Sequence, residues 1–197
     1  MSGGVVEEIA YIYTLGHRRA IDLMDELSED QIRWRPGRSN SIAFNFWHIS
    51  RWADHMRSVL PGITPAMRGR LAAAEEMWRR ENIAANWGLR SDALGWVETG
   101  MGMDEAVSAT LDLPEKSKLV DYGKRVFAEA EGAVVLLKDE DLAQPAEFDP
   151  ARVPWAKPAD YRTVGNWVVA AISHDSRHLG MIEALKGAAG PSGTASR

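Results

Sequence analysis

The sequence of 197 residues contains no cysteine. This absence excludes disulfide frameworks, thiolate zinc sites, iron–sulfur clusters and cysteine nucleophiles, and it leaves the redox compartment open. Basic residues are also outnumbered: the chain has 23 lysines and arginines and 28 acidic residues, which give a formal net charge of −5. Proteins that bind nucleic acid usually carry a basic face, so we expect no nucleic-acid partner.

Long apolar runs are absent as well. The longest extends from Trp167 to Ile172, whereas about 20 apolar residues are needed to span a bilayer. The N-terminus has neither the basic start nor the uninterrupted apolar core of a signal peptide. These observations predict a soluble, cytoplasmic protein with no membrane partner. The length and the 45% hydrophobic content predict a single domain that folds without a metal or a disulfide.

Four segments repeat apolar residues at the three- and four-residue spacing of an amphipathic helix. They extend from about Val5 to Leu27, Ser41 to Leu60, Pro114 to Lys138 and Thr163 to Lys186. Ser28 and Gln31 predict a capping box after the first helix, and Gly187 predicts the end of the last one. The pattern predicts an all-α fold, a four-helix bundle with long crossovers.

The segments between these helices are less regular. Residues 64–113 have helical composition only in part, over residues 66–86, and predict a helical insertion between the second and third helices. Residues 143–162 contain four prolines, which forbid a helix and predict an extended crossing that is either functional or mobile. We expect residues 1–187 to form one bundle domain and residues 188–197 to form a disordered tail.

Five histidines are present, and three of them indicate a metal site. His174 and His178 lie one turn apart on the apolar face of the fourth helix, so their ring nitrogens can converge on one ion. His48 lies on the apolar face of the second helix and can supply a third nitrogen if the two helices are neighbours. Three histidines with open remaining positions are typical of a catalytic metal site. Three separately hydrogen-bonded core histidines are the alternative.

The other two histidines are expected to have different roles. His55 is two turns, about 10.5 Å, from His48, so the two are not expected to share an ion, and we expect His55 at the end of the bundle. His17 is expected in the core, with a hydrogen bond at the site as the alternative. We expect Asp175, about 100° round the helix from His174, to face a neighbouring helix or solvent.

Three tryptophans and an asparagine are candidates to surround the site. Trp47, Trp52 and Trp155 can line a pocket, although the first two are explained at least as well as core residues. Trp155 lies on the proline-containing crossing and is the better candidate for a lid. Asn45, one turn before His48, is a candidate to orient that ring through a hydrogen bond. No carboxylate stands out as a general base, so no catalytic residue is assigned.

The two histidine segments also carry a family resemblance. Residues 32–36 (IRWRP), 40–43 (NSIA) and 47–49 (WHI) resemble the second-helix signature of the DinB/YfiT-like superfamily. Residues 174–183 (HDSRHLGMIE), with the leucine and glycine that follow at 185 and 187, resemble its fourth helix. The resemblance covers most of the chain, from the first helix to Gly187.

The resemblance implies a four-helix bundle with up-down-down-up topology, often a homodimer, that holds a divalent metal ion, zinc or nickel. The positions that match the family's metal ligands are His48, His174 and His178. Two departures concern the pocket. Met181 stands where many relatives carry glutamine, which removes a polar group near the site, and residues 64–113 are longer than the minimal family pattern.

Characterised relatives include S-transferases for small thiols and thiol-dependent isomerases, so the resemblance implies a metal-dependent enzyme acting on a small molecule. We expect a thiol S-transferase in which the ion stabilises the thiolate of a low-molecular-weight thiol co-substrate. A metal-dependent hydrolase, and a non-catalytic bundle that binds a metal or a small ligand, are alternatives. A further alternative is a protein that binds other proteins and holds no metal.

Overall fold

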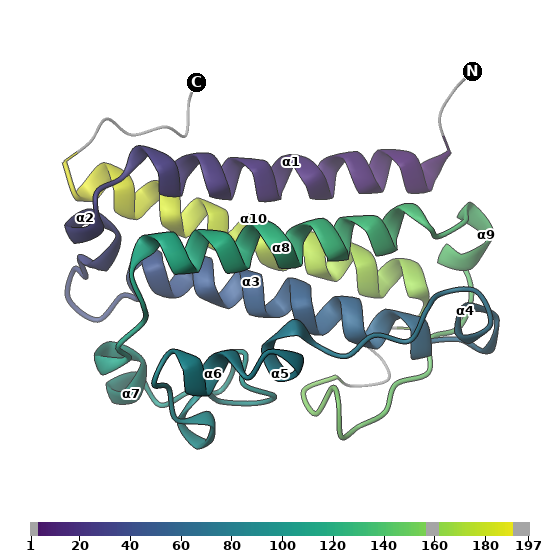
Figure 1. Cartoon of the computed structure of the whole chain (residues 1–197). Coiled ribbons are helices and arrows are strands. Elements are labelled where there is room, and N and C mark those ends of the chain that lie inside the picture. Colours follow the sequence, from purple (N-terminus) through teal and green to yellow (C-terminus); the bar gives the residue numbers. More distant parts are fainter. Residues whose placement is uncertain (1–3, 157–161, 191–197) are drawn as a thin grey trace.

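The computed structural model of the chain describes residues 4–156 and 162–190. Within these residues the regular structure is helical, as the sequence predicts, and two isolated β-bridges occur instead of a sheet. The body of the molecule consists of four long helices (Figure 1). They are α1 (Val5–Glu26), α3 (Ile42–Val59), α8 (Lys116–Val135) and α10 (Val164–Ala188).

The long helices pack in pairs around one core. α1 contacts α8 and α10, and α3 contacts the same two helices from the other side. Figure 1 shows α1 and α10 running in one direction and α3 and α8 in the opposite direction. This arrangement places α3 beside α10, which is the condition for His48 to reach the histidines of α10.

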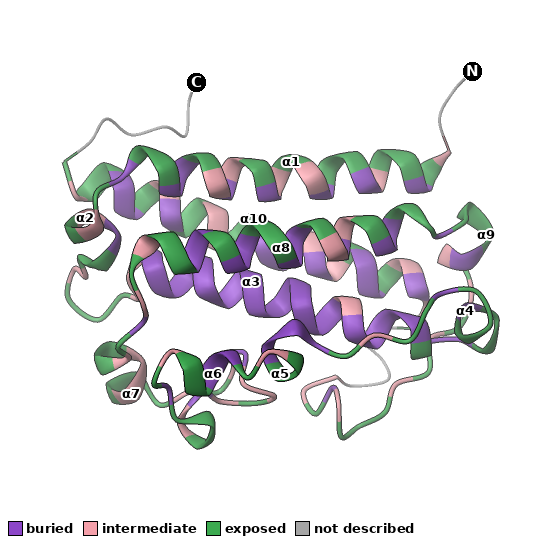
Figure 2. Cartoon of the chain, in the orientation of Figure 1, coloured by how far each residue is buried: buried purple, intermediate pink, exposed green. Residues whose placement is uncertain are grey.

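Short helices cover the outer face of α3 and complete the molecule. Every residue of α3 except Arg57 is buried, and Figure 2 shows α3 buried along its whole length. The long helices cover it on one side and the chain between α3 and α8 covers it on the other (Figure 1). The remaining elements are α2 (Glu29–Arg33), η1 (Leu60–Gly62), α4 (Pro65–Arg68), α5 (Met77–Arg80), α6 (Ile83–Asn86), η2 (Ser91–Ala93), α7 (Glu105–Thr110) and α9 (Asp139–Leu142).

Local capping explains several helix starts. Ser28 and Gln31 form the predicted capping box at the start of α2, and the Ser41 hydroxyl accepts the backbone N–H of Phe44 at the start of α3. The helical composition of residues 66–86 gives three short helices, α4, α5 and α6, and not one long helix.

Three predicted helix boundaries are wrong, and one of them is the end of α8, which lies at Val135 and not at Lys138. α8 begins at Lys116, so Pro114 precedes the helix and does not lie in its first turn; the Glu29 carboxylate of α2 accepts the Lys116 N–H at 2.9 Å. α10 continues through Gly187 to Ala188, and the residue with left-handed backbone is Gly190, at φ 106°. The C-terminal end therefore lies slightly later than the sequence pattern indicates.

Some predictions fall outside the described residues. These are residues 191–197 of the predicted tail and residues 157–161 of the crossing, which include Pro158. Over the described part of the chain, no helix combines the length and the apolar character that a bilayer crossing requires.

Candidate metal centre

The three histidines selected from the sequence meet in the structure. His48 comes from α3, and His174 and His178 come from α10, with one ring nitrogen of each within 4.8 Å of the others. The Nε2 atoms of His48 and His174 are 3.0 Å apart. The ring centroid of His178 lies 4.5 Å from that of His48 and 4.6 Å from that of His174. The predicted convergence of the three imidazoles is therefore present.

Each imidazole has its Nδ1 atom engaged away from this meeting point. His48 Nδ1 donates to the backbone carbonyl of Thr99, His174 Nδ1 to Asp175 Oδ1 at 3.1 Å, and His178 Nδ1 to Asn45 Oδ1 at 2.8 Å. A carbonyl or carboxylate oxygen accepts only, so these contacts place the ring hydrogen on Nδ1 and leave the Nε2 lone pair free. This is the form in which histidine binds a metal ion.

The donor set therefore fits a divalent cation. Two Nε2 lone pairs at 3.0 Å repel each other unless a positive charge lies between them. Burial and the neighbouring histidines lower the pKa of His48 well below its ordinary value. Burial, followed by the charge of His174, lowers the pKa of His178 to about 4. Both rings are thus neutral near pH 7, as metal ligation requires.

A chain of polar groups extends outward from His174. Asp175 accepts from His174 with one carboxylate oxygen, and its other oxygen lies 3.4 Å from His17 Nε2 in α1. His17 Nδ1 lies 2.7 Å from Glu131 Oε1 in α8. Burial alone would raise the pKa of Asp175, but the hydrogen bonds from His17 and His174 hold it below its ordinary value. Asp175 therefore faces α1, a neighbouring helix, which is one of the two positions expected from the sequence; the other was solvent.

The other two histidines are both buried, in different surroundings. His17 is buried between the rings of Tyr13 and Phe127, so it is the core residue that was expected, and it also contacts the partner of His174. His55 lies about one turn before the C-terminal end of α3. It is buried under the insertion, with Nδ1 2.9 Å from Glu76 Oε1. The sequence pattern missed this because Glu76 lies on a different element.

Two further predictions about the surroundings are wrong. Asn45 bonds His178 and not His48, because its side chain faces α10; its amide nitrogen donates to the Ser41 carbonyl at 2.8 Å, which turns the oxygen toward His178. Met181 does not lie on the buried face, since its side chain is 49% exposed. Ile182, the next residue, is fully buried, so Met181 points away from the core at this level of α10.

A cavity of about 270 Å³ opens beside His174. Its lining comes from α3, α10 and the insertion and comprises Trp52, Met56, Met101, Trp167, Ala170, Ala171, Ser173, His174 and Arg177. The ring centroid of Trp52 lies 4.8 Å from that of His174. His174 therefore borders a largely apolar pocket of small-molecule size.

The three candidate tryptophans occupy different places. Trp52 lines the cavity, which is one of the two roles expected for it; the other was a core residue. Trp47 is fully buried in the core, with its ring centroid 6.2 Å from that of Trp78. Trp155 packs against Trp52 at 4.8 Å and against His55 at 5.5 Å between ring centroids, so it covers the back of Trp52.

The 95–102 loop of the insertion contributes a contact that the sequence did not reveal. Its Thr99 carbonyl is the acceptor for His48 Nδ1. Gly100, at φ 87°, lies so close that a Cβ atom there would come within 3.0 Å of His48 Nδ1. The cluster of glycines at 95, 100 and 102 was the one available signal of a tight backbone approach.

Comparison with known proteins points to one family. The family model described as the DinB superfamily matches residues 12–182. Among the solved structures that match is a conserved protein from Enterococcus faecalis, with a TM-score of 0.69 and 17% identity over 94% of this chain and 97% of that chain. Identity this low shows the fold alone. No curated protein matches the sequence.

Proposed function

Because the chain belongs to the DinB superfamily, whose members often bind metals, we propose that it is a divalent-metal-dependent enzyme acting on a small molecule. The proposed ligands are His48, His174 and His178. The observation that carries the proposal is that these three rings converge while each Nδ1 is held by a separate acceptor. Such anchoring orients imidazoles for a metal ion.

Two features favour a catalytic centre over a structural one. Within the described residues, no carboxylate and no further imidazole joins the three-histidine cluster. Three protein ligands leave coordination positions for water or substrate, and the cavity beside His174 gives a small molecule access to them. A nitrogen-only donor set suits zinc or nickel.

We propose thiol S-transfer as the reaction. The bound ion would supply stabilisation of a thiolate. The chain has no cysteine, so the sulfur must come from a low-molecular-weight thiol co-substrate. Asn45, Asp175 and the Thr99 carbonyl hold the three imidazoles in place. Trp52 and Trp167 give the cavity apolar walls that limit the access of water to an electrophilic co-substrate.

The family also supplies proposals about assembly. We propose the up-down-down-up topology for the bundle, which the helix directions in Figure 1 support. We further propose a homodimer, supported by exposed apolar side chains along α1, namely Val5, Tyr11, Ile12 and Leu15. Apolar side chains gathered on one face of a helix favour an interface.

Metal analysis combined with an activity screen tests the function. Tag-free protein incubated with zinc or nickel should hold about one equivalent, and His174→Ala should lose tight binding while keeping the helical circular dichroism spectrum. The loaded protein is then assayed with thiols and electrophiles in all combinations. Failure to retain either metal would overturn the proposal. Turnover that proceeds without a thiol would instead identify a hydrolase.

A further inference from the structure

The cavity beside His174 carries a positive charge without a counter-ion. Arg177 follows His174 by three residues and precedes His178 on α10, and it lines the cavity. In the described part of the chain no carboxylate pairs with it. Its charge helps to lower the pKa of His178, after burial and the effect of His174, so the guanidinium lies close to the centre.

The rest of the lining suits a flat, apolar molecule. Trp52 and Trp167 supply aromatic walls, and methionine and alanine side chains supply most of the remainder. The indole Nε1 of Trp52 is buried and has no acceptor among the described residues. A volume of about 270 Å³ lies near the lower end of ordinary ligand pockets, about 300 Å³.

We propose that this cavity binds a compact organic anion with a planar, apolar body and one carboxylate held by Arg177. The proposal rests on the proposed function and names the substrate class of the same site. A guanidinium binds a carboxylate through two parallel hydrogen bonds, which gives both affinity and orientation. The body of the ligand then packs between the aromatic walls beside His174.

Calorimetric titration of zinc-loaded protein with cinnamate and with its neutral analogue cinnamamide tests the proposal. Wild type should bind the anion at least tenfold more tightly than the amide. Arg177→Gln should lose this preference, and Arg18→Gln, which removes an exposed arginine from α1, should keep it. Equal affinity for the two ligands in wild type would overturn the proposal.

A preference that survives in Arg177→Gln would also overturn it, because the metal ion would then be holding the carboxylate. Bound zinc is quantified in the same samples. Protein that holds no zinc counts against the proposed function, whereas zinc-loaded protein that does not prefer the anion counts only against the substrate class.

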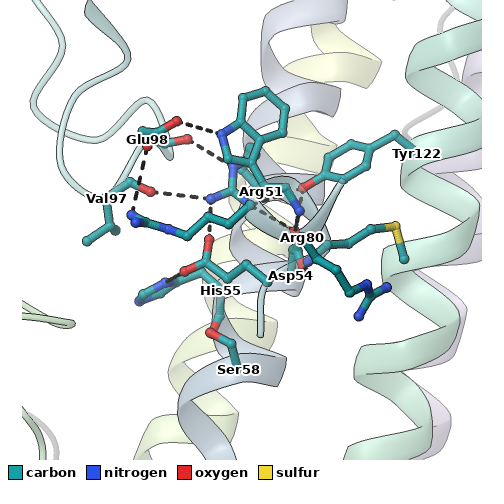
Figure 3. Close-up of polar contacts among 12 residues, drawn as sticks. Arg51, Asp54, His55, Ser58, Arg80, Val97, Glu98 and Tyr122 are labelled. Carbon is teal, nitrogen blue, oxygen red and sulfur yellow. Dashed lines mark hydrogen bonds and ion pairs between the residues drawn. The ribbon is translucent and has the colours of Figure 1, made fainter. Parts of the chain in front are cut away.

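A second inference rests on Arg51, a fully buried arginine of α3. Figure 3 shows its guanidinium between two groups of partners. On one side it contacts Asp54 Oδ2 and the Tyr122 hydroxyl, both at 3.0 Å, and Glu76 Oε2 at 2.5 Å. On the other side it donates to the backbone carbonyls of residues 97 and 98, at 3.3 and 3.0 Å.

Those two carbonyls belong to the loop that meets His48. Val97 and Glu98 have φ angles of 45° and 58°. This left-handed conformation is unfavourable for residues other than glycine, and above all for a β-branched valine. Strained backbone of this kind persists only where its surroundings hold it, and it concentrates at functional sites. Thr99, the next residue, presents its carbonyl to His48 Nδ1.

We propose that the 95–102 loop, which Arg51 holds in place, positions His48 in the metal centre. The hydrogen bonds of Arg51 hold the loop against α3, so that the Thr99 carbonyl keeps the hydrogen of His48 on Nδ1 and leaves Nε2 for the ion. The carboxylates of Asp54 and Glu76 fix the guanidinium from the opposite side. The insertion therefore acts on the centre through one backbone contact.

Replacing Arg51 would leave two buried carboxylates without a partner and can unfold the protein, so the test uses glycines. A Cβ atom on Gly100 would lie 2.9 Å from Trp47 and 3.0 Å from His48 Nδ1, whereas one on Gly88 would meet nothing within 4 Å. Both residues have positive φ, 87° and 72°, so Gly88→Ala is a matched control for backbone strain.

Zinc affinity should fall by about 10- to 100-fold in Gly100→Ala and stay near wild type in Gly88→Ala. Nitrogen NMR of the metal-free protein should show His48 as the Nδ1–H tautomer in wild type and in Gly88→Ala, and a mixture of tautomers in Gly100→Ala. Equal zinc affinity in the two variants, or an unchanged tautomer in Gly100→Ala, would overturn the proposal.

Discussion

At the scale of single residues, the three imidazoles of the centre are held by three different kinds of acceptor. His48 meets a backbone carbonyl, His178 an amide and His174 the carboxylate of Asp175. A charged acceptor makes an imidazole more basic than a neutral one does. His174 is therefore expected to be the strongest donor of the three.

Asp175→Asn tests this difference. Removing the charge behind His174 should lower zinc affinity by about 10- to 100-fold. Competition with a chromophoric chelator measures the affinity, and Asp22→Asn, an exposed position on α1, serves as the control. Unchanged affinity in Asp175→Asn would mean that the carboxylate only fills space.

Glu76 is expected to control stability at acid pH. Burial alone would raise its pKa, but the hydrogen bond from His55 and the charge of Arg51 lower it from 4.5 to about 2. The resulting stabilisation is complete above pH 4.5 and is lost as the pH falls from 4.5 toward 2. The two pKa values of 4.5 and about 2 correspond to roughly 3 kcal/mol.

Urea unfolding at a series of pH values from 6 to 3 measures this contribution. Glu76→Gln should be less stable than wild type at pH 6 and should lose less stability on acidification. Parallel pH profiles for the two proteins would show that Glu76 does not have a lowered pKa.

Helical periodicity was sufficient to select the three histidines that meet in the structure, since it reports which residues share a helix face. It could not predict their partners. Thr99 acts through a backbone carbonyl, which carries no side-chain signal, and Glu76 approaches His55 from a different element. Asn45 was assigned to the wrong histidine because the rotation of α3 against α10 is a property of packing and not of the helix itself.

At the scale of elements, α3 and α8 pack tightly against each other at a glycine. A Cβ atom on Gly123 of α8 would lie 2.6 Å from Phe46 of α3, whereas one on Gly132 of the same helix would meet nothing within 4 Å. The first glycine is thus explained by packing between the helices. The second has no such contact to explain it.

The two glycines give opposite predictions for replacement by alanine. Gly123→Ala should destabilise the protein by about 1–3 kcal/mol, because the added methyl group must displace Phe46. Gly132→Ala should stabilise it by about 0.5–1 kcal/mol, because alanine favours the helix. Chemical denaturation measures both. Changes of the same sign would contradict the packing explanation.

The long helices were predictable because their apolar faces repeat over five or more turns. The short ones were not, and α5 shows why. Its first amides, at Met77 and Trp78, donate to the two carboxylate oxygens of Asp54 in α3, both at 2.8 Å. A helix capped from another element has no local start signal in its sequence.

At the scale of the whole molecule, α1 and α10 present a shared apolar face. The ion pairs Arg19–Glu183 and Lys186–Glu26 set these parallel helices side by side (Figure 1). Ile12 lies two turns before Arg19 on α1. Val5 precedes Arg19 by as many residues as Val169 precedes Glu183, so on parallel helices the two valines are expected at the same level. The side chains of Val5, Ile12 and Val169 are all about half exposed.

Ile12→Lys is therefore expected to weaken the proposed homodimer, because it places a charge in the middle of this face. Sedimentation velocity should show a shift from dimer to monomer at micromolar concentration. Val135→Lys, at an equally exposed position at the end of α8, should leave the association unchanged. If both variants sediment as wild type does, the interface lies elsewhere.

Trp52, beside His174, links the proposed metal centre to the protein's tryptophan fluorescence. The ring of Trp52 lies 4.8 Å from that of His174, so an ion held by the three histidines would have an indole as a neighbour. An open-shell nickel ion quenches indole emission at such range, whereas zinc, with its filled d shell, does not. The protein's own fluorescence can thus report which metal has entered, without any added dye.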